Sequence, residues 1–312
     1  MKILVTGGCG FIGSNFINYY LDTHPNDEIV NIDRLDYCSK ETNVNPHHNY
    51  TFIKGDINDK DLIFGILNNF KIDTVIHFAA QSHVDNSFEK WTSIDFTRDN
   101  VLGTHTLLEC CRIYNKIHRF LHMSTDEVYG EVDINHSGCV EKSVLDPTNP
   151  YAATKAGAEM IVRSYNHSYG IPSIIMRCNN VYGPNQYPEK VIPRFMSQLQ
   201  IGKKCTIHGN GQNRRNFIHA HDVSTAIDII LQNGRVGKTY NIGTDNEYSV
   251  LDIAKILVEK YKPGENLNDW IEFVPDRYFN DFRYSIDSSE LLKLGWKQKF
   301  NDLNLYIQAD HL

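Results

Sequence analysis

The sequence predicts an α/β protein in which a Rossmann-type, doubly wound parallel sheet is joined to a smaller, discontinuous α/β substrate lobe. Short β-rich apolar runs alternate with segments of helical periodicity as far as Arg177. A glycine-rich turn joins the first of these strands to the first helix. Because strands that alternate with helices need right-handed crossovers, they form one parallel sheet with helices on both faces.

The elements follow one another in a regular order. Residues 2–6 form an apolar strand, and apolar positions from Ile12 to Leu21 recur at helical spacing after it. Further strands are expected at 29–33, 50–54, 74–79, 120–124 and 173–177, and further helices at 62–70, 95–114 and 151–169.

After Arg177 the alternation loosens, and turn signals such as Tyr-Gly-Pro and Gly-Asn-Gly separate shorter elements. Strand and helix character returns near 216–232 and 238–242, so the chain is expected to re-enter the first domain there. We expect a cofactor-binding domain of residues 1–178 plus about 214–243, and a lobe of about 179–213 plus 244–312.

Composition narrows the class of protein. Of the 312 residues, 41% are hydrophobic and 22% are charged, which is typical of a globular chain. The net charge of -7 argues against a nucleic-acid partner, whose binding domain carries a basic face. The seven scattered cysteines predict free thiols, and His83 has no partner histidine or cysteine at metal-ligand spacing, so no metal is expected. Since no run of about 18 apolar residues occurs, we expect a cytoplasmic protein without a membrane span.

Glycines at 7, 10 and 13 directly follow the first strand and open the first helix. This spacing is typical of a dinucleotide-binding turn. Gly7 permits the tight turn, Gly10 lets a pyrophosphate approach the backbone, and Gly13 allows the helix to pack closely on the strand. The free N–H groups at the helix start hold the diphosphate, which makes Phe11 and Ile12 candidate cofactor contacts.

Asp33 ends the second strand, where a carboxylate can accept hydrogen bonds from the ribose hydroxyls of the adenosine. Its charge would repel a 2′-phosphate, so NAD is favoured over NADP, although Arg34 beside it could soften that preference. Residues that follow the other strands complete the expected cofactor site: Asp56, Ile57, Ala79, Ala80 and Cys178.

Tyr151 and Lys155 stand one helical turn apart on one face of the helix expected at 151–169. A nearby ammonium favours phenolate, so Lys155 is expected to lower the pKa of Tyr151 from about 10 toward neutral pH. Tyr151 could then remove a hydroxyl proton while hydride leaves the same carbon for the cofactor. Both side chains are therefore expected to contact the cofactor.

Together these motifs resemble the extended short-chain dehydrogenases over nearly the whole chain. The run from Ser124 to Gly130, Ser-Thr-Asp-Glu-Val-Tyr-Gly, resembles the signature of the dTDP-glucose and UDP-glucose 4,6-dehydratases. The resemblance implies that C4 of a hexose is oxidised first. It further implies that Glu127 takes the C5 proton, that protonated Asp126 releases the C6 hydroxyl as water, and that Thr125 binds the C4 oxygen.

The same resemblance implies a binding site for a nucleotide-diphosphate hexose. Forked N–H donors of arginine suit phosphate oxygens well. The substrate contacts that it implies are Ser82, His83, Asp85, Thr125, Asn180, Glu189, Lys190, Arg215, Asn241 and Arg277. Tyr278 follows Arg277 where bacterial dTDP enzymes commonly have proline, so the sequence leaves open whether the nucleotide is dTDP or UDP.

Two other functions remain open from the sequence. A nucleotide-sugar epimerase or decarboxylase on the same scaffold is disfavoured by Asp126 beside Glu127, because those relatives typically lack this acid pair. A non-catalytic NAD-sensing protein is disfavoured by the presence of Thr125, Tyr151 and Lys155 together. The resemblance also implies a homodimer, paired through the helices at 95–114 and 151–169, and a place in deoxysugar synthesis such as that of rhamnose.

Overall fold

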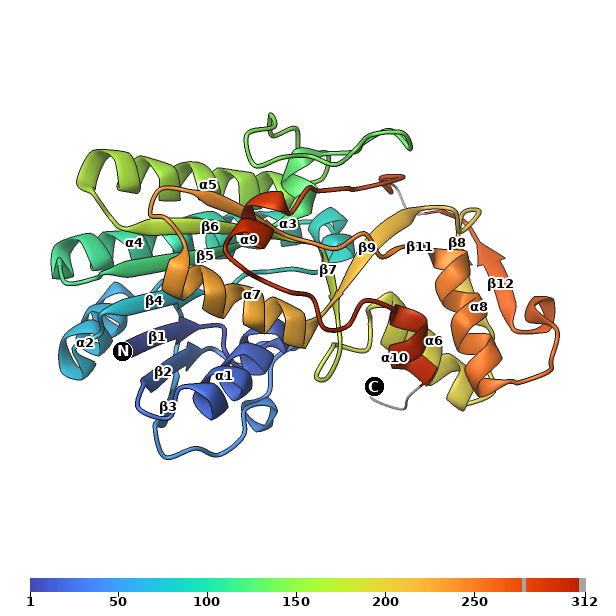
Figure 1. Ribbon diagram of the computed structural model, residues 1–312, viewed down its shortest axis with the longest axis horizontal. Coiled ribbons are helices and arrows are strands. Elements are labelled where there is room, and N and C mark those ends of the chain that lie inside the picture. The colour runs from blue at the N-terminus through green and yellow to red at the C-terminus, as the bar shows by residue number, and fades with distance from the viewer. Residues whose placement is uncertain (277–278, 309–312) are drawn as a thin grey trace.

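The computed structural model describes residues 1–276 and 279–308, and a seven-stranded parallel sheet forms its centre (Figure 1). The strand order is β10-β6-β5-β4-β1-β2-β3. The chain adds strands on one side of β1 and then, from β4 on, on the other side, as in a doubly wound fold. The predicted fold class is therefore confirmed. The strands are β1 (Lys2–Thr6), β2 (Glu28–Asp33), β3 (Tyr50–Lys54), β4 (Thr74–His77), β5 (Arg119–Thr125), β6 (Ser173–Cys178) and β10 (Thr239–Ile242).

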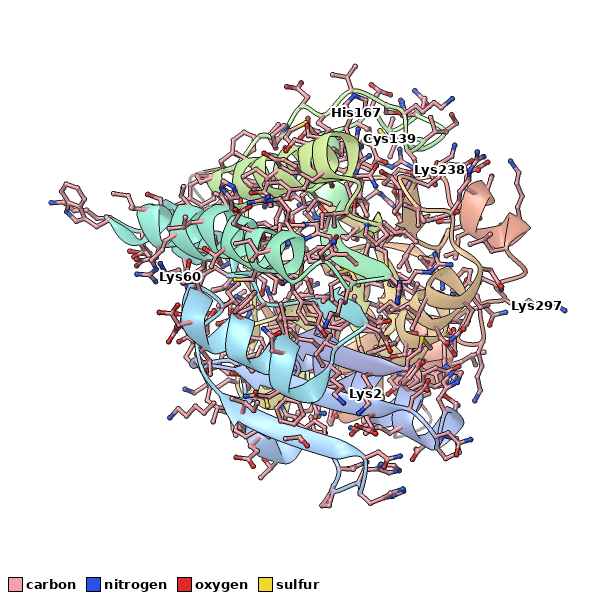
Figure 2. The ribbon with its side chains drawn as sticks, turned by 90° about the vertical axis from the view of Figure 1, so that its left-hand side faces the viewer. Lys2, Lys60, Cys139, His167, Lys238 and Lys297 are labelled. Carbon is pink, nitrogen blue, oxygen red and sulfur yellow. The ribbon has the colours of Figure 1, made fainter. Side chains whose placement is uncertain are left out.

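Helices cover both faces of this sheet. Side chains that alternate along β1 go to opposite sides: Ile3 belongs to the same apolar cluster as Phe16 of α1, and Leu4 to the same cluster as Leu107 of α4. One face carries α1 (Phe11–Thr23) and α7 (Ala220–Asn233), and the other carries α2 (Lys60–Phe70), α4 (Gly103–Tyr114) and α5 (Pro150–Tyr169). Figure 2 shows the second layer from the side, with α2, α4 and α5 next to one another and Lys60 at the start of α2.

The helix expected at 95–114 is interrupted. The chain forms α3 (Thr92–Phe96), then a π-helix η3 (Thr97–Leu102), and only then α4. The wider turn buries Asp99 and Asn100, and Thr104 Oγ1 donates 2.6 Å to the carbonyl oxygen of Asn100. Inserted π turns are frequently found at functional sites. The strand expected at 74–79 also ends earlier, at His77.

A second set of elements lies beside the carboxyl ends of the central strands (Figure 1). Two small sheets belong to it, β11-β9-β7 and β12-β8, and its helices pack around their own apolar core. The strands are β7 (Asn180–Tyr182), β8 (Cys205–His208), β9 (Arg214–His219), β11 (Glu247–Ser249) and β12 (Ile271–Val274). The helices are α6 (Val191–Gln200), α8 (Val250–Tyr261) and α10 (Leu303–Gln308).

The last part of the described chain returns to the central sheet. Helix α9 (Ser289–Lys293) lies against β10, and Leu291 and Trp296 pack into the same apolar cluster as Tyr240. The exact division into two lobes stays a prediction. Short 3-10 turns complete the structure: η1 (Glu41–Asn43), η2 (Val84–Phe88), η4 (Asp126–Tyr129) and η5 (Leu267–Asp269). Within residues 1–276 and 279–308, no helix has both the length and the apolar character needed to cross a bilayer.

Candidate active site

A pocket of about 440 Å³ follows the carboxyl ends of the central strands and reaches the second set of elements. Both the place and the volume suit a small-molecule site in an α/β fold. Nearly all of the predicted site residues line it. They are Gly7, Gly10, Phe11, Ile12, Gly13, Asp33, Asp56, Ile57, Ala79, Ala80, Ser82, His83, Asp85, Thr125, Asp126, Glu127, Tyr151, Lys155, Cys178, Asn180, Glu189, Lys190 and Arg215.

Two predicted substrate contacts do not join this set. Asn241 lies on β10 and is completely buried outside the pocket lining. Its amide donates to the carbonyl oxygens of Cys139 and Asp287 at 2.9 and 2.8 Å, and its Oδ1 accepts 2.8 Å from Tyr129. The structure therefore gives Asn241 a role in the fold in place of the predicted substrate contact. Arg277 lies outside the described residues.

The glycine turn has the geometry of a dinucleotide cradle. Gly7 has φ +71°, and a Cβ there would lie 2.6 Å from the backbone nitrogen of Ala79. A Cβ on Gly13 would lie 2.6 Å from the Gly7 carbonyl oxygen. Helix α1 starts at Phe11, and no described side chain caps it. Its first N–H groups therefore face the pocket without intrahelical partners, which fits a diphosphate.

Asp33 is held rigidly at the end of β2. Its carboxylate accepts hydrogen bonds from the backbone nitrogens of Cys9 and Leu35 at 3.0 and 2.8 Å, and from Ser39 Oγ at 3.0 Å. The residue lines the pocket next to the glycine turn. This position suits a carboxylate that receives ribose hydroxyls.

The acid pair lies at the carboxyl end of β5. Thr125 ends that strand and caps η4, so the chain turns sharply and leaves Asp126 and Glu127 in the pocket. Asp126 is 2% exposed, and its Oδ2 accepts 2.7 Å from Asn179 Nδ2. Burial raises the pKa of Asp126, while the bond from Asn179 and the charge of Arg215 act in the opposite direction.

Glu127 accepts a hydrogen bond of 2.9 Å from Asn149 Nδ2. Burial, followed by the negative charge of Asp126, raises the pKa of Glu127 to about 7. The charge of Asp126 thus makes ionisation of Glu127 more costly. Near neutral pH the pair can retain one proton, which provides one acid and one base.

Tyr151 and Lys155 are buried side by side on α5, but their electrostatics differ from the prediction. Lys155 Nζ donates 2.7 Å to the carbonyl oxygen of Met123, and burial lowers the pKa of the ammonium to about 8. Burial and the charge of Glu127 raise the pKa of Tyr151 above its ordinary value, and a hydrogen bond with Thr125 partly offsets them. The prediction that Lys155 lowers the pKa of Tyr151 is therefore wrong for this arrangement, because the ammonium donates to a backbone carbonyl of β5.

Sequence reasoning missed the two asparagines that hold the acids. Asn149 precedes Pro150 and caps α5 by accepting 2.8 Å from the backbone nitrogen of Ala152. Asn179 directly follows β6, and its Oδ1 accepts 3.1 Å from the backbone nitrogen of Thr244. Both residues stand directly before or after an element that borders the pocket. Their position next to the predicted helix and strand could have indicated that they reach the site.

The two sides of the pocket meet across its mouth. His83 Nδ1 lies 3.3 Å from Glu189 Oε1, and Lys190 Nζ donates 3.3 Å to the carbonyl oxygen of Ser82. On β9, the Arg215 guanidinium lies 4.4 Å from the ring centre of Tyr284. Cationic groups therefore face the pocket opposite the glycine turn. In the described part of the chain, no cluster of three or more potential metal ligands occurs.

Comparison with known proteins agrees with this geometry. The family model described as GDP-mannose 4,6 dehydratase matches residues 4–305. A trifunctional UDP-glucose 4,6-dehydratase/UDP-4-keto-6-deoxy-D-glucose 3,5-epimerase/UDP-4-keto-L-rhamnose-reductase of Arabidopsis thaliana is 48% identical over 304 residues, which are 96% of this chain and 45% of the plant protein. The chain thus spans less than half the length of that relative.

Shorter relatives match along most of their length. A dTDP-D-glucose 4,6-dehydratase of Homo sapiens is 45% identical over 305 residues, which cover 96% of this chain and 85% of the human protein. The crystal structure of a dTDP-glucose 4,6-dehydratase of Bacillus anthracis in complex with NAD superposes with a TM-score of 0.90 at 37% identity, covering 99% of this chain and 94% of that one. The chain belongs to the GDP-mannose 4,6 dehydratase family, in which it resembles the dTDP- and UDP-glucose 4,6-dehydratases.

Proposed function

We propose that the chain is an NAD-dependent nucleotide-sugar 4,6-dehydratase, a hydro-lyase that converts dTDP-glucose or UDP-glucose to the 4-keto-6-deoxyglucose nucleotide. The observation that carries the proposal is the pair of buried Asp126 and partly buried Glu127 beside Tyr151, in the pocket that contains the glycine turn. Relatives named as 4,6-dehydratases and a relative solved with NAD support the same assignment.

In this proposal the residues of the first domain hold NAD. The N–H groups after Gly10 receive the diphosphate, Asp33 receives the adenosine ribose, and Lys155 steadies the nicotinamide end. NAD held there would supply the hydride acceptor for C4 and the hydride donor for C6, and its positive charge would favour phenolate at Tyr151. The domain of residues 1–178 plus about 214–243 carries this site, and the lobe of about 179–213 plus 244–312 carries the sugar nucleotide.

Three side chains move the protons. Tyr151 takes the proton of the C4 hydroxyl as the C4–H bond breaks, with Thr125 bonded to the same oxygen. The new ketone acidifies C5, and Glu127 removes that proton. Asp126 gives its proton to the C6 hydroxyl, so the C6–O bond breaks and water leaves. Glu127 then gives its proton back to C5 as C6 is reduced. The proton left on Tyr151 replaces, through solvent, the one that Asp126 lost, so the net change is the loss of one water.

Substrate recognition falls to the opposite side of the pocket. Arg215 and Lys190 suit the diphosphate, with Asn180 beside them. Ser82, His83, Asp85 and Glu189 lie around the mouth, where they can reach hexose hydroxyls. Neither dTDP nor UDP is favoured by these contacts, so both are proposed.

A direct test uses the purified protein with dTDP-glucose and UDP-glucose separately. We expect a product lighter than the substrate by one water and no net gain of reduced nicotinamide. Asp126→Asn and Glu127→Gln should each abolish water loss. If both variants turn over as the wild type does, a sugar-nucleotide epimerase or decarboxylase replaces the dehydratase. Bound NAD without any turnover would support an NAD-sensing protein instead.

The chain is also proposed to form a homodimer through α4 and α5. Large apolar side chains are exposed on these helices and on the preceding π-helix: Leu102, Ile113, Met160 and Tyr169. Burying such residues in an interface is favourable by about 25 cal/mol per Å² of apolar surface. Light scattering should report twice the chain mass for the wild type and a shift toward monomer for Met160→Glu. A wild-type monomer would remove this proposal.

We further propose a cytoplasmic role in making deoxysugars such as rhamnose. The name of the plant relative includes a 3,5-epimerase and a 4-keto reductase, which are reactions that consume a 4-keto-6-deoxy sugar. Adding enzymes of these two classes to the product mixture should yield a nucleotide-linked 6-deoxyhexose, and failure to do so would exclude the pathway.

A further inference from the structure

The guanidinium of Arg34 is enclosed by carboxylates at the β2 end of the pocket. Its Nη2 lies 2.6 Å from Asp99 Oδ2 and 2.7 Å from Asp36 Oδ2. Its Nη1 lies 3.4 Å from Asp56 Oδ2. We call Asp36, Asp56 and Asp99 the carboxylate cage. The cage members come from the loop after β2, the loop after β3 and the π-helix, and all of them line the pocket with Arg34.

Several features of the backbone and of the neighbours build this cage. Leu35 has φ +59°, which turns the chain so that Asp36 lies back against Arg34. Left-handed backbone is uncommon for a residue such as leucine. Gln81 Nε2 donates to Asp36 Oδ2 at 3.2 Å and to Asp99 Oδ2 at 3.0 Å, so one amide ties two cage members together.

The buried member of the cage keeps its charge. The Asp99 side chain is only 6% exposed and sits on the π-helix. Burial alone would raise the pKa of Asp99, but hydrogen bonds from Arg34 and Arg98 hold it below its ordinary value. Three carboxylates therefore surround one guanidinium, and each of its three nitrogens donates to at least one of them.

We propose that the carboxylate cage withholds Arg34 from the cofactor and so makes the site select NAD against NADP. The inference rests on the proposed binding of NAD. Asp33 marks the place where adenosine ribose hydroxyls lie in this fold. A 2′-phosphate there needs a cation with free donors, and the adjacent Arg34 is the residue type that commonly supplies it. With Arg34 caged, the phosphate meets Asp33 and an excess of negative charge.

The test measures dissociation constants of NAD and NADP by calorimetry on the full chain freed of nucleotide. Asp36→Asn is the first variant, because Asp36 is half-exposed and the amide of asparagine has the same shape as the carboxylate. Asp36→Asn with Asp99→Asn opens the cage further. We expect NADP to bind about tenfold tighter than to the wild type, equivalent to about 1.4 kcal/mol, with NAD affinity nearly unchanged.

Two controls isolate the role of Arg34. Asp61→Asn removes an exposed carboxylate of α2 with the same change in net charge, and it should leave both affinities unchanged. Arg34→Met in the opened background should erase the gain for NADP. The inference is overturned if opening the cage fails to strengthen NADP binding, or if the gain survives without Arg34. If the wild type binds neither nucleotide, the proposed function is overturned as well. If the wild type and the cage variants bind NAD but the variants gain no affinity for NADP, only the inference about the cage fails.

Discussion

The side-chain amide of Asn149 donates a hydrogen bond of 2.9 Å to Oε2 of Glu127, and its carbonyl oxygen accepts one of 2.8 Å from Ala152 N. One residue therefore fixes both the start of the helix that carries Tyr151 and the carboxylate proposed as the C5 base. The amide donation lowers the pKa of Glu127 against the effect of burial. The geometry of the helix cap is thus linked to the protonation of the base.

Asn149→Ala and Asn149→Ser should both move the acidic limb of kcat/KM to higher pH, by about half a unit to one unit. The reason is that each loses the amide that favours ionised Glu127. Alanine should also lower stability by about 1 kcal/mol because the cap is lost, whereas serine keeps a capping oxygen. Rate profiles and melting curves separate the two effects. If Asn149→Ser has the acidic limb of the wild type, only the helix cap affects the profile, and the proposed link between Asn149 and the pKa of Glu127 is wrong.

A second expectation concerns the whole pH profile of kcat/KM. Glu127, with a pKa of about 7, must lose its proton to act, so the rate falls as pH decreases through that value. Lys155, with a pKa lowered by burial to about 8, must keep its proton, so the rate also falls as pH rises through that value. We expect a narrow bell. Lys155→Arg retains its positive charge at high pH, so the fall of kcat/KM on the alkaline side should disappear. If that fall is unchanged in the variant, it belongs to a group other than Lys155.

The succession of strands and helices along the chain could be predicted because local periodicity and the glycine spacing indicate it. Strands expected near β1, β2 and β3 occur within one residue of the predicted bounds. The π-helix η3 could not be predicted in this way. Its wide turn depends on tertiary bonds, such as that of the Asn100 side chain to Gln81 N at 2.8 Å, which helical periodicity does not encode.

The site was predicted as a set of residue types more successfully than as a set of interactions. Spacing correctly puts Tyr151 and Lys155 on one buried face of α5. It does not reveal that Met123, on a neighbouring strand, accepts from the ammonium. The roles of Asn149 and Asn179 likewise depend on loops that meet only in the folded chain, and neither residue type is diagnostic by itself.

The raised pKa of Glu127 implies a cost in stability. The folded chain retains this proton between about pH 4.5 and 7, while the unfolded chain releases it, so stability decreases as pH rises through that window. Glu127→Gln should therefore stabilise the protein at pH 8 by about 1–2 kcal/mol, a value reduced because the side chain keeps some exposure. The gain should be several-fold smaller near pH 5 and vanish below about pH 4. Urea unfolding at both values tests this, with exposed Glu259→Gln as control, and an equal gain at both pH values would contradict it.

A buried ion pair of Glu159 and Arg177 anchors the helix that carries Tyr151. Both side chains are 0% exposed, and Glu159 Oε2 lies 2.6 Å from Arg177 Nη2. Ser124 Oγ donates 2.6 Å to Glu159 Oε1, and the guanidinium lies 4.6 Å from the ring centre of Tyr129. Glu159 stands two turns after Tyr151 on α5, so the pair ties that helix to β6 and to the strand that ends at the acid pair.

Breaking this pair from one side should be severe, because a charge is left buried without its partner. We expect Glu159→Leu to reduce the free energy of unfolding by about 3–5 kcal/mol. Adding Arg177→Met should recover most of that loss, since two apolar side chains of similar size replace two desolvated charges. If the pair also positions Tyr151, the recovered double variant will still have a lower kcat than the wild type with NAD affinity retained. Full recovery of both stability and kcat would show that the pair serves the fold alone.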